Sequence, residues 1–141
     1  MSSVELHPIE VSAIEWLIAG DLPVLHALRQ QFACAVPVRR QVSSAGSFTQ
    51  FRLTRDDLPK INPPTLKLSA LDVELPGGPN GSVGFMLILS MGKIAELEAF
   101  TYADPMPDLA AIDVERCSFA YTDNRRGDLL SLSRAVVYPP E

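Results

Sequence analysis

Glu96 and Glu98 are the two residues whose type and spacing are best suited to acid–base catalysis. They lie two positions apart in residues 93–102, a segment in which apolar and polar residues alternate. If this segment is a β-strand, both carboxylates project from the same face. Two carboxylates on one face can act as a general acid and a general base. Solvent-facing strands commonly carry charges at this spacing too, so the pair alone does not predict an enzyme.

The residues around this pair favour binding over catalysis. Met86 and Ile94 frame it on one side, and Phe100 and Tyr102 frame it on the other. An acidic patch bordered by aliphatic and aromatic side chains is more typical of a binding surface than of a strand that only faces water.

Other catalytic or metal-binding patterns are scarce. Neither His7 nor His26 is followed by another histidine or a cysteine at the helical spacing of metal ligands. Cys34 has no histidine on the same predicted element that would activate it as a nucleophile. The glycine-rich segment 77–81 lacks the Gly-Lys-Ser/Thr ending of a phosphate-binding loop. We therefore expect no enzyme activity, no metal site and no cofactor.

The composition predicts one domain, residues 1–141, because the chain is long enough for a core and 47% of its residues are hydrophobic. The net charge of −5 disfavours nucleic-acid binding. No apolar run approaches the roughly 20 residues that cross a bilayer, and the N-terminal residues lack the pattern of a secretory signal. Cys34 and Cys117 are expected to be reduced thiols in a cytoplasmic protein, although their spacing leaves a disulfide open.

Charge is distributed unevenly along the chain. Residues 36–67 contain six basic residues and two acidic ones, whereas residues 72–115 contain eight acidic residues and one basic one. Strands of opposite charge that lie side by side would support each other. The other interpretation is an acidic surface that binds a basic partner.

Residues 83–102 predict an antiparallel hairpin at the centre of a sheet, with its turn at Gly92. A two-residue turn would place Leu87 opposite Glu96, which conflicts with burial of one face. We therefore expect a three-residue turn, residues 90–92, which places Leu87 opposite Ala95. The predicted core face of this hairpin consists of Val83, Phe85, Leu87, Leu89, Ala95, Leu97 and Ala99.

The rest of the chain predicts an α+β fold, with two N-terminal helices packed on one face of a mainly antiparallel β-sheet. Apolar spacing and end signals indicate helices over residues 8–19 and from residue 21 to 32, and Trp16 is expected to anchor them to the sheet. Further strands are expected at 38–42, 48–54, 66–75, 113–121 and 129–138. A change of apolar phase between Leu68 and Leu71 indicates either a β-bulge or a different strand boundary.

The segment Gly92-Lys93-Ile94-Ala95-Glu96-Leu97-Glu98-Ala99-Phe100-Thr101-Tyr102-Ala103-Asp104 resembles a hairpin motif of small bacterial α+β proteins. The motif reads Gly, Lys or Arg, Ile or Leu, then Leu-Glu, then Tyr before an acidic residue. Some of these proteins resemble immunity proteins that neutralise polymorphic or contact-dependent toxins. The resemblance covers residues 71–107 and implies neither a cofactor nor a catalytic residue.

These observations favour a binding protein, most concretely an immunity protein that occludes the active site of a toxin. A nuclease-type toxin with a basic cleft would suit an acidic inhibitor. The expected partner-binding residues are Asp72, Glu74, Glu96, Glu98, Asp104 and Asp108. We expect a monomer or weak homodimer that binds neither nucleic acid nor membrane. The alternatives are a small enzyme or ligand-binding domain with a pocket between helices and sheet, and a domain that self-associates through an edge strand.

Overall fold

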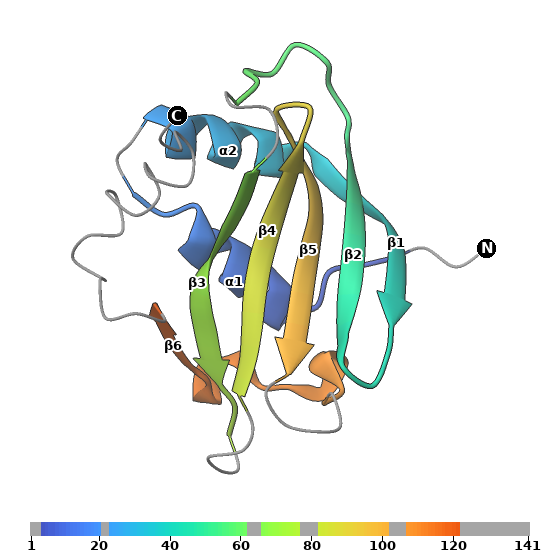
Figure 1. Cartoon of the computed structure of the whole chain (residues 1–141), viewed down its shortest axis with the longest axis vertical. Coiled ribbons are helices and arrows are strands. Elements are labelled where there is room, and N and C mark those ends of the chain that lie inside the picture. The colour runs from blue at the N-terminus through green and yellow to red at the C-terminus, as the bar shows by residue number, and fades with distance from the viewer. Residues whose placement is uncertain (1–3, 21–22, 62–65, 77–81, 102–106, 122–141) are drawn as a thin grey trace.

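The computed structural model describes residues 4–20, 23–61, 66–76, 82–101 and 107–121 (Figure 1). Two helices precede the strands, and two short 3-10 helices precede the last strand. In chain order the elements are α1 (Pro8–Leu17), α2 (Pro23–Ala33), β1 (Ala35–Val42), β2 (Gly46–Leu53), β3 (Leu66–Glu74), β4 (Ser82–Ser90), β5 (Lys93–Thr101), η1 (Leu109–Ala111), η2 (Val114–Arg116) and β6 (Ser118–Tyr121). The predicted strand at 129–138 lies outside the described residues.

The six described strands form one antiparallel sheet in the order β1-β2-β5-β4-β3-β6. The β4–β5 hairpin is at its centre, as the sequence predicts. Both helices lie behind the sheet in Figure 1, where α1 contacts β3 and β4 and α2 contacts β5. The prediction of an α+β fold with two N-terminal helices on one face of an antiparallel sheet is therefore confirmed.

Helix α1 begins at Pro8, where proline costs nothing because the first helical N–H has no partner within the helix. The Glu10 carboxylate accepts a 2.8 Å hydrogen bond from the backbone N–H of His7, which stabilises this first turn. Ile9, Ala13, Ile14 and Leu17 recur at helical spacing and are buried against the sheet.

The hairpin turn differs from the prediction. Met91 and Gly92 have φ angles of 55° and 78°, so they form a two-residue turn whose central residues are both left-handed. This geometry matches the twist of the two strands. Ser90 accordingly lies opposite Lys93, and the predicted three-residue turn is wrong.

A bulge on β5 then sets the register of the remaining pairs. Leu89 lies opposite Ile94, but Ile88 lies opposite Glu96, so Ala95 is the extra residue. Leu87 consequently pairs with Leu97 rather than with Ala95 as predicted. The bulge also turns Ile94 into the core in place of the half-buried Ala95. The rest of the predicted core face is buried: Val83, Phe85, Leu87, Leu89, Leu97 and Ala99.

The Gln31 side chain of α2 forms hydrogen bonds to this hairpin turn. This side chain is fully buried, and its Nε2 donates to the Gly92 carbonyl at 2.9 Å and to the Pro59 carbonyl at 2.7 Å. Its Oε1 accepts a 2.8 Å bond from the backbone N–H of Ile94. One amide therefore satisfies backbone groups of the turn, of β5 and of the loop after β2, where regular strand pairing ends.

Two other sequence features have clear structural counterparts. The register of β3 shifts between Leu68 and Leu71, which supports the bulge of the two predicted alternatives. Trp16 is half-buried and stacks on Phe119 of β6, with ring centroids 5.5 Å apart, so it anchors α1 to β6, the last of the described strands in the sheet order. The strand predicted at 113–121 is shorter than expected, because residues 114–116 form η2 and only Ser118–Tyr121 pairs with β3.

Replacing Met91 with asparagine is expected to raise the free energy of unfolding by about 0.5 to 1 kcal/mol. A left-handed backbone costs an ordinary L-residue roughly 1 to 2 kcal/mol, and asparagine tolerates it better. The Met91 side chain is 78% exposed, so little packing is lost. The matched control, Met91→Ala, removes the same side chain and keeps the strained backbone. Equal chemical-denaturation midpoints for the two variants would contradict this account of the turn.

Candidate functional site

The sheet has one face that the described helices do not cover, which we call the open face. Residues directly opposite each other on neighbouring strands project from the same face. Because Leu87 and Leu97 pair on the helix side, the alternate residues of β4 and β5 project from the open face. This face carries Arg39 and Gln41 from β1, Phe48, Gln50 and Arg52 from β2, Glu96, Glu98 and Phe100 from β5, Met86 and Ile88 from β4, and Asp72 and Glu74 from β3.

Glu96 and Glu98 lie at the centre of the open face, as the sequence predicts for a pair on one side of a strand. Glu96 lies between Gln50 of β2 and Ile88 of β4. Glu98 lies between Phe48 and Met86. All four of these cross-strand neighbours are uncharged, and the ion pairs between described side chains do not include either carboxylate.

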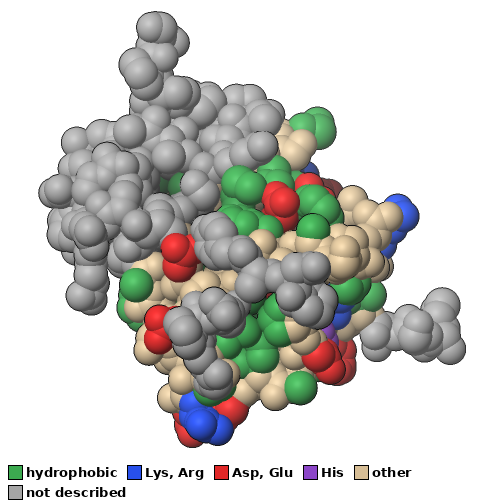
Figure 2. All heavy atoms as spheres, turned by 60° about the horizontal axis from the view of Figure 1, so that its bottom comes forward, with side chains coloured by type: hydrophobic (Ala, Val, Ile, Leu, Met, Phe, Trp, Pro, Cys, Tyr) green, Lys and Arg blue, Asp and Glu red, His purple; other side chains and the backbone are tan. Residues whose placement is uncertain are grey.

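Asp72 and Glu74 extend the acidic surface to β3. Asp72 lies opposite Gly84 of β4, and Glu74 lies opposite Ser82. Neighbouring strands are about 4.8 Å apart, so β3 is roughly 10 Å from β5 across β4. Four of the six predicted binding residues therefore share the open face. Figure 2, in which the lower end of Figure 1 comes forward, shows acidic side chains both among hydrophobic ones and at the rim of the view, where some lie beside Lys or Arg.

The other two predicted binding residues belong elsewhere. Asp108 caps η1, where its Oδ1 accepts a 3.1 Å hydrogen bond from the backbone N–H of Ala110. It lines a pocket near the start of α1 and not the open face. Asp104 lies outside the described residues.

A buried polar cluster that the sequence analysis missed lies on the helix side of the sheet. Glu10 is fully buried, and its Oε1 accepts hydrogen bonds from the His7 backbone N–H and from Nη2 of Arg40, with which it forms an ion pair. Its Oε2 accepts a 3.1 Å bond from the hydroxyl of Thr49, which is also buried. We call Glu10, Arg40 and Thr49 the Glu10 cluster. It joins α1 to β1 and β2.

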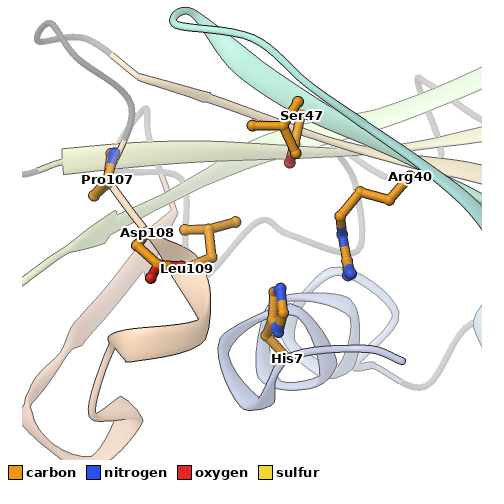
Figure 3. Close-up of a pocket in the computed structure, with 7 residues that line it drawn as sticks. His7, Arg40, Ser47, Pro107, Asp108 and Leu109 are labelled. Atoms are coloured by element: carbon orange, nitrogen blue, oxygen red, sulfur yellow. The ribbon is translucent and has the colours of Figure 1, made fainter. Parts of the chain in front are cut away.

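A pocket of about 80 Å³ adjoins the Glu10 cluster and is lined by His7, Arg40, Val42, Ser47, Pro107, Asp108 and Leu109. Figure 3 shows Arg40 and Ser47 extending from the sheet, His7 at the start of α1, and Asp108 and Leu109 on the opposite wall. Gly46 allows β2 to approach β5 closely next to Ser47, because a Cβ there would lie 2.2 Å from the Ala99 carbonyl oxygen.

Two hydrogen-bond donors at this pocket are buried without a partner among the described residues. They are the Ser47 hydroxyl and Nε of Arg40. Ser47 is 3% exposed, and the Arg40 side chain is 17% exposed. A buried polar group without a hydrogen bond costs about 1 to 3 kcal/mol. Such groups therefore call for an acceptor, in the form of water or a ligand.

The described side chains do not assemble an activated nucleophile. The Ser47 hydroxyl has no hydrogen bond to a base, although His7 lines the same pocket. Burial, together with the nearby Asp113 charge, raises the pKa of the Cys117 thiol, which is the opposite of what a reactive cysteine needs. The exposed pair of Arg55 and Asp57 lowers the pKa of Asp57, a local effect at the surface.

No family model, curated protein or solved structure matches this chain. The resemblance of residues 92–104 to the hairpin of immunity proteins therefore stays a prediction. Within the described ranges, neither helix is long and apolar enough to cross a membrane. In the same part of the chain, no three His, Cys, Asp or Glu side chains are grouped so that they could hold a metal ion.

Proposed function

We propose that this protein binds a basic protein partner through the open face, most concretely as an immunity protein that blocks the active site of a toxin. The observation that carries the proposal is the position of Glu96 and Glu98 at the centre of the sheet face that the described helices leave open, directly opposite uncharged neighbours. The alternative interpretation of the charge pattern is support between oppositely charged strands, and it would place bases directly opposite these acids. Their neighbours on β2 are Gln50 and Phe48 instead. The bases that the register places on this face are one step further away: Arg39 of β1 lies opposite Gln50, and Arg52 of β2 lies opposite Val36.

The open face also offers apolar area for the centre of an interface. Met86 and Ile88 are half-buried directly opposite Glu98 and Glu96, and Phe48 is 39% exposed. Interfaces combine apolar contact at the centre with charges that select and orient the partner. A basic partner would therefore gain both steering from the acids and apolar burial against the sheet, without rearrangement of the central hairpin.

The proposal predicts a toxin-like reading frame next to this gene, and the test is the association rate of the purified chain with the protein that such a reading frame encodes. Glu96→Lys combined with Glu98→Lys is expected to slow association about 10- to 100-fold at low salt and to flatten the salt dependence, because steering by charge is lost. The thermal midpoint should change little, because both side chains project from the open face.

The matched control is Glu5→Lys combined with Glu15→Lys, which changes the net charge equally at two exposed positions away from the open face. This variant should keep most of the association rate. If the two double variants slow association equally, net charge alone explains the effect and the open face is not the interface. An unchanged rate in the Glu96/Glu98 variant would refute the proposal.

A further inference from the structure

A groove opens on the sheet beside the hairpin turn, where β2 and β5 separate (Figure 1). β2 pairs with β5 only as far as Gln50, which lies opposite Glu96, whereas its pairing with β1 continues to Leu53. The bulge at Ala95 lies on β5 at the same point. The hollow measures about 540 Å³, within the roughly 300 to 1,000 Å³ of sites that hold drug-sized ligands. We call this hollow the turn groove.

The side chains that a ligand would meet in the turn groove are polar and accessible. Phe51 and Ile94 line it but are almost fully buried, with exposures of 9% and 2%. Arg52 and Asp56 are exposed, and Lys93 is half-buried. The two bases outnumber the one acid, and the ion pairs between described side chains include neither base. The turn groove therefore suits a carboxylate, which both bases can bind by charge-assisted hydrogen bonds.

The charge of the open face changes sign along its strands. Arg52 and Lys93 project from the end next to the hairpin turn, because each alternates with a buried neighbour on its own strand. Glu96 and Glu98 follow along β5, and strand pairing aligns Asp72 two residues past Glu98. Lys93 and Glu98 are five residues apart on β5, so the positive and negative parts of the face are separated by roughly 15 Å.

One partner of ordinary size would cover both parts. A stable interface buries about 800 Å² on each side, which corresponds to a patch roughly 30 Å across. A partner centred on Glu96 and Glu98 therefore also covers the turn groove. If that partner were basic throughout, it would place like charges against Arg52 and Lys93, which costs affinity. An acidic segment at this position removes the conflict and pairs with both bases.

We propose that the partner of the open face places an acidic peptide segment in the turn groove while its basic residues cover Glu96 and Glu98. The inference rests on the proposed function, because it concerns the same partner. It makes Arg52 and Lys93 the residues that select the orientation of that partner. A partner turned by half a rotation would set its bases against Arg52 and Lys93 and its acids against the glutamates.

The experiment is a nitrogen-15 NMR titration of the purified chain at low salt with two end-blocked peptides, tetraglutamate and tetra-arginine. We expect tetraglutamate to shift the backbone amide signals of Arg52 and Lys93 saturably, and tetra-arginine to shift those of Glu96 and Glu98. Arg52→Gln should weaken tetraglutamate binding about two- to fivefold, the range for one exposed ion pair. Arg116→Gln is the matched control, because it removes one exposed arginine in η2, outside the turn groove, and should bind tetraglutamate nearly as well as the wild type.

The two peptides separate this inference from the proposed function. If tetraglutamate gives no saturable shift at the turn groove, or if Arg52→Gln and Arg116→Gln weaken its binding equally, the inference is wrong whatever tetra-arginine does. Failure of tetra-arginine to bind at Glu96 and Glu98 would instead refute the proposed function, and the two-signed interface with it. Glu96→Gln combined with Glu98→Gln should weaken the binding of tetra-arginine alone. Weaker tetraglutamate binding in that variant would show that the two charges do not act at separate sites, which contradicts the inference.

Discussion

Replacing Glu10 with alanine is expected to lower the free energy of unfolding by about 3 to 5 kcal/mol, the cost of breaking a buried ion pair by removing one partner. Glu10 is fully buried and accepts hydrogen bonds from the His7 backbone, from Arg40 and from Thr49. The substitution leaves a mostly buried guanidinium without its counter-charge and a buried hydroxyl without its acceptor. Chemical denaturation followed by circular dichroism measures the change.

Two further variants separate charge from packing in this prediction. Glu15→Ala removes an exposed glutamate from the same helix and should change the unfolding free energy by less than about 0.5 kcal/mol. Glu10→Leu combined with Arg40→Met replaces the pair with apolar side chains and should recover most of the lost stability. If the combined variant is as unstable as Glu10→Ala, the unpaired charge is not the main source of the cost.

The central hairpin illustrates how much of the fold the sequence can predict. A long apolar run, a glycine and an alternating segment are enough to place β4 and β5 together. They are also enough to identify Leu87 and Leu97 as core residues. The details of the turn are not predictable in this way, because a bulge at Ala95 compensates for a two-residue turn and restores the same faces. Alternation alone cannot distinguish a longer turn from a tight turn followed by a bulge.

The bulge on β3 was predictable because it leaves a trace in the sequence. The apolar phase changes between Leu68 and Leu71, and the register shifts between the same two residues. The bulge on β5 leaves no comparable trace, since Ile94 and Ala95 are both apolar and either one suits the core. A bulge can be recognised in a sequence only where the two faces of the strand differ in polarity, because the alternation of apolar and polar residues then shifts at the bulge.

The Glu10 cluster and its pocket depend on contacts between distant parts of the chain. Glu10 and Arg40 are 30 residues apart, and Glu10 and Thr49 are 39 apart. No local pattern reports such a pairing. One signal was nevertheless present: Glu10 lies on the apolar side of α1, next to Ile9 and one turn before Ala13 and Ile14. A carboxylate on a helix face that is otherwise apolar requires a buried partner.

The candidate binding residues also fall into two groups: those that a local pattern places correctly and those whose position depends on contacts between distant parts of the chain. Glu96 and Glu98 could be placed together because two positions on one strand share a face whatever the register. Asp72 and Glu74 join them because β3 pairs with β4. Asp108 was grouped with these acids on charge alone, yet the 3-10 turn that it caps carries it to the pocket near α1. Charge runs in a sequence therefore predict a surface only when the strand order is also known.

Replacing Leu87 with alanine is expected to lower the free energy of unfolding by about 2 to 5 kcal/mol, the range for truncating a buried leucine. Leu87 is fully buried at the centre of the sheet, opposite Leu97 on β5 and Leu68 on β3. The neighbouring Ile88 projects from the open face and is half-buried, so Ile88→Ala provides a matched control that should cost clearly less. Glu96→Ala, on the same face as Ile88, should cost least, within about 1 kcal/mol. The denaturant midpoint should therefore be lowest for Leu87→Ala, intermediate for Ile88→Ala and highest for Glu96→Ala. This order follows because the turn and the bulge at Ala95 together decide which face of the sheet each side chain occupies. Comparable midpoints for Leu87→Ala and Glu96→Ala would show that these faces are assigned wrongly, and the acidic open face would then lose its structural basis.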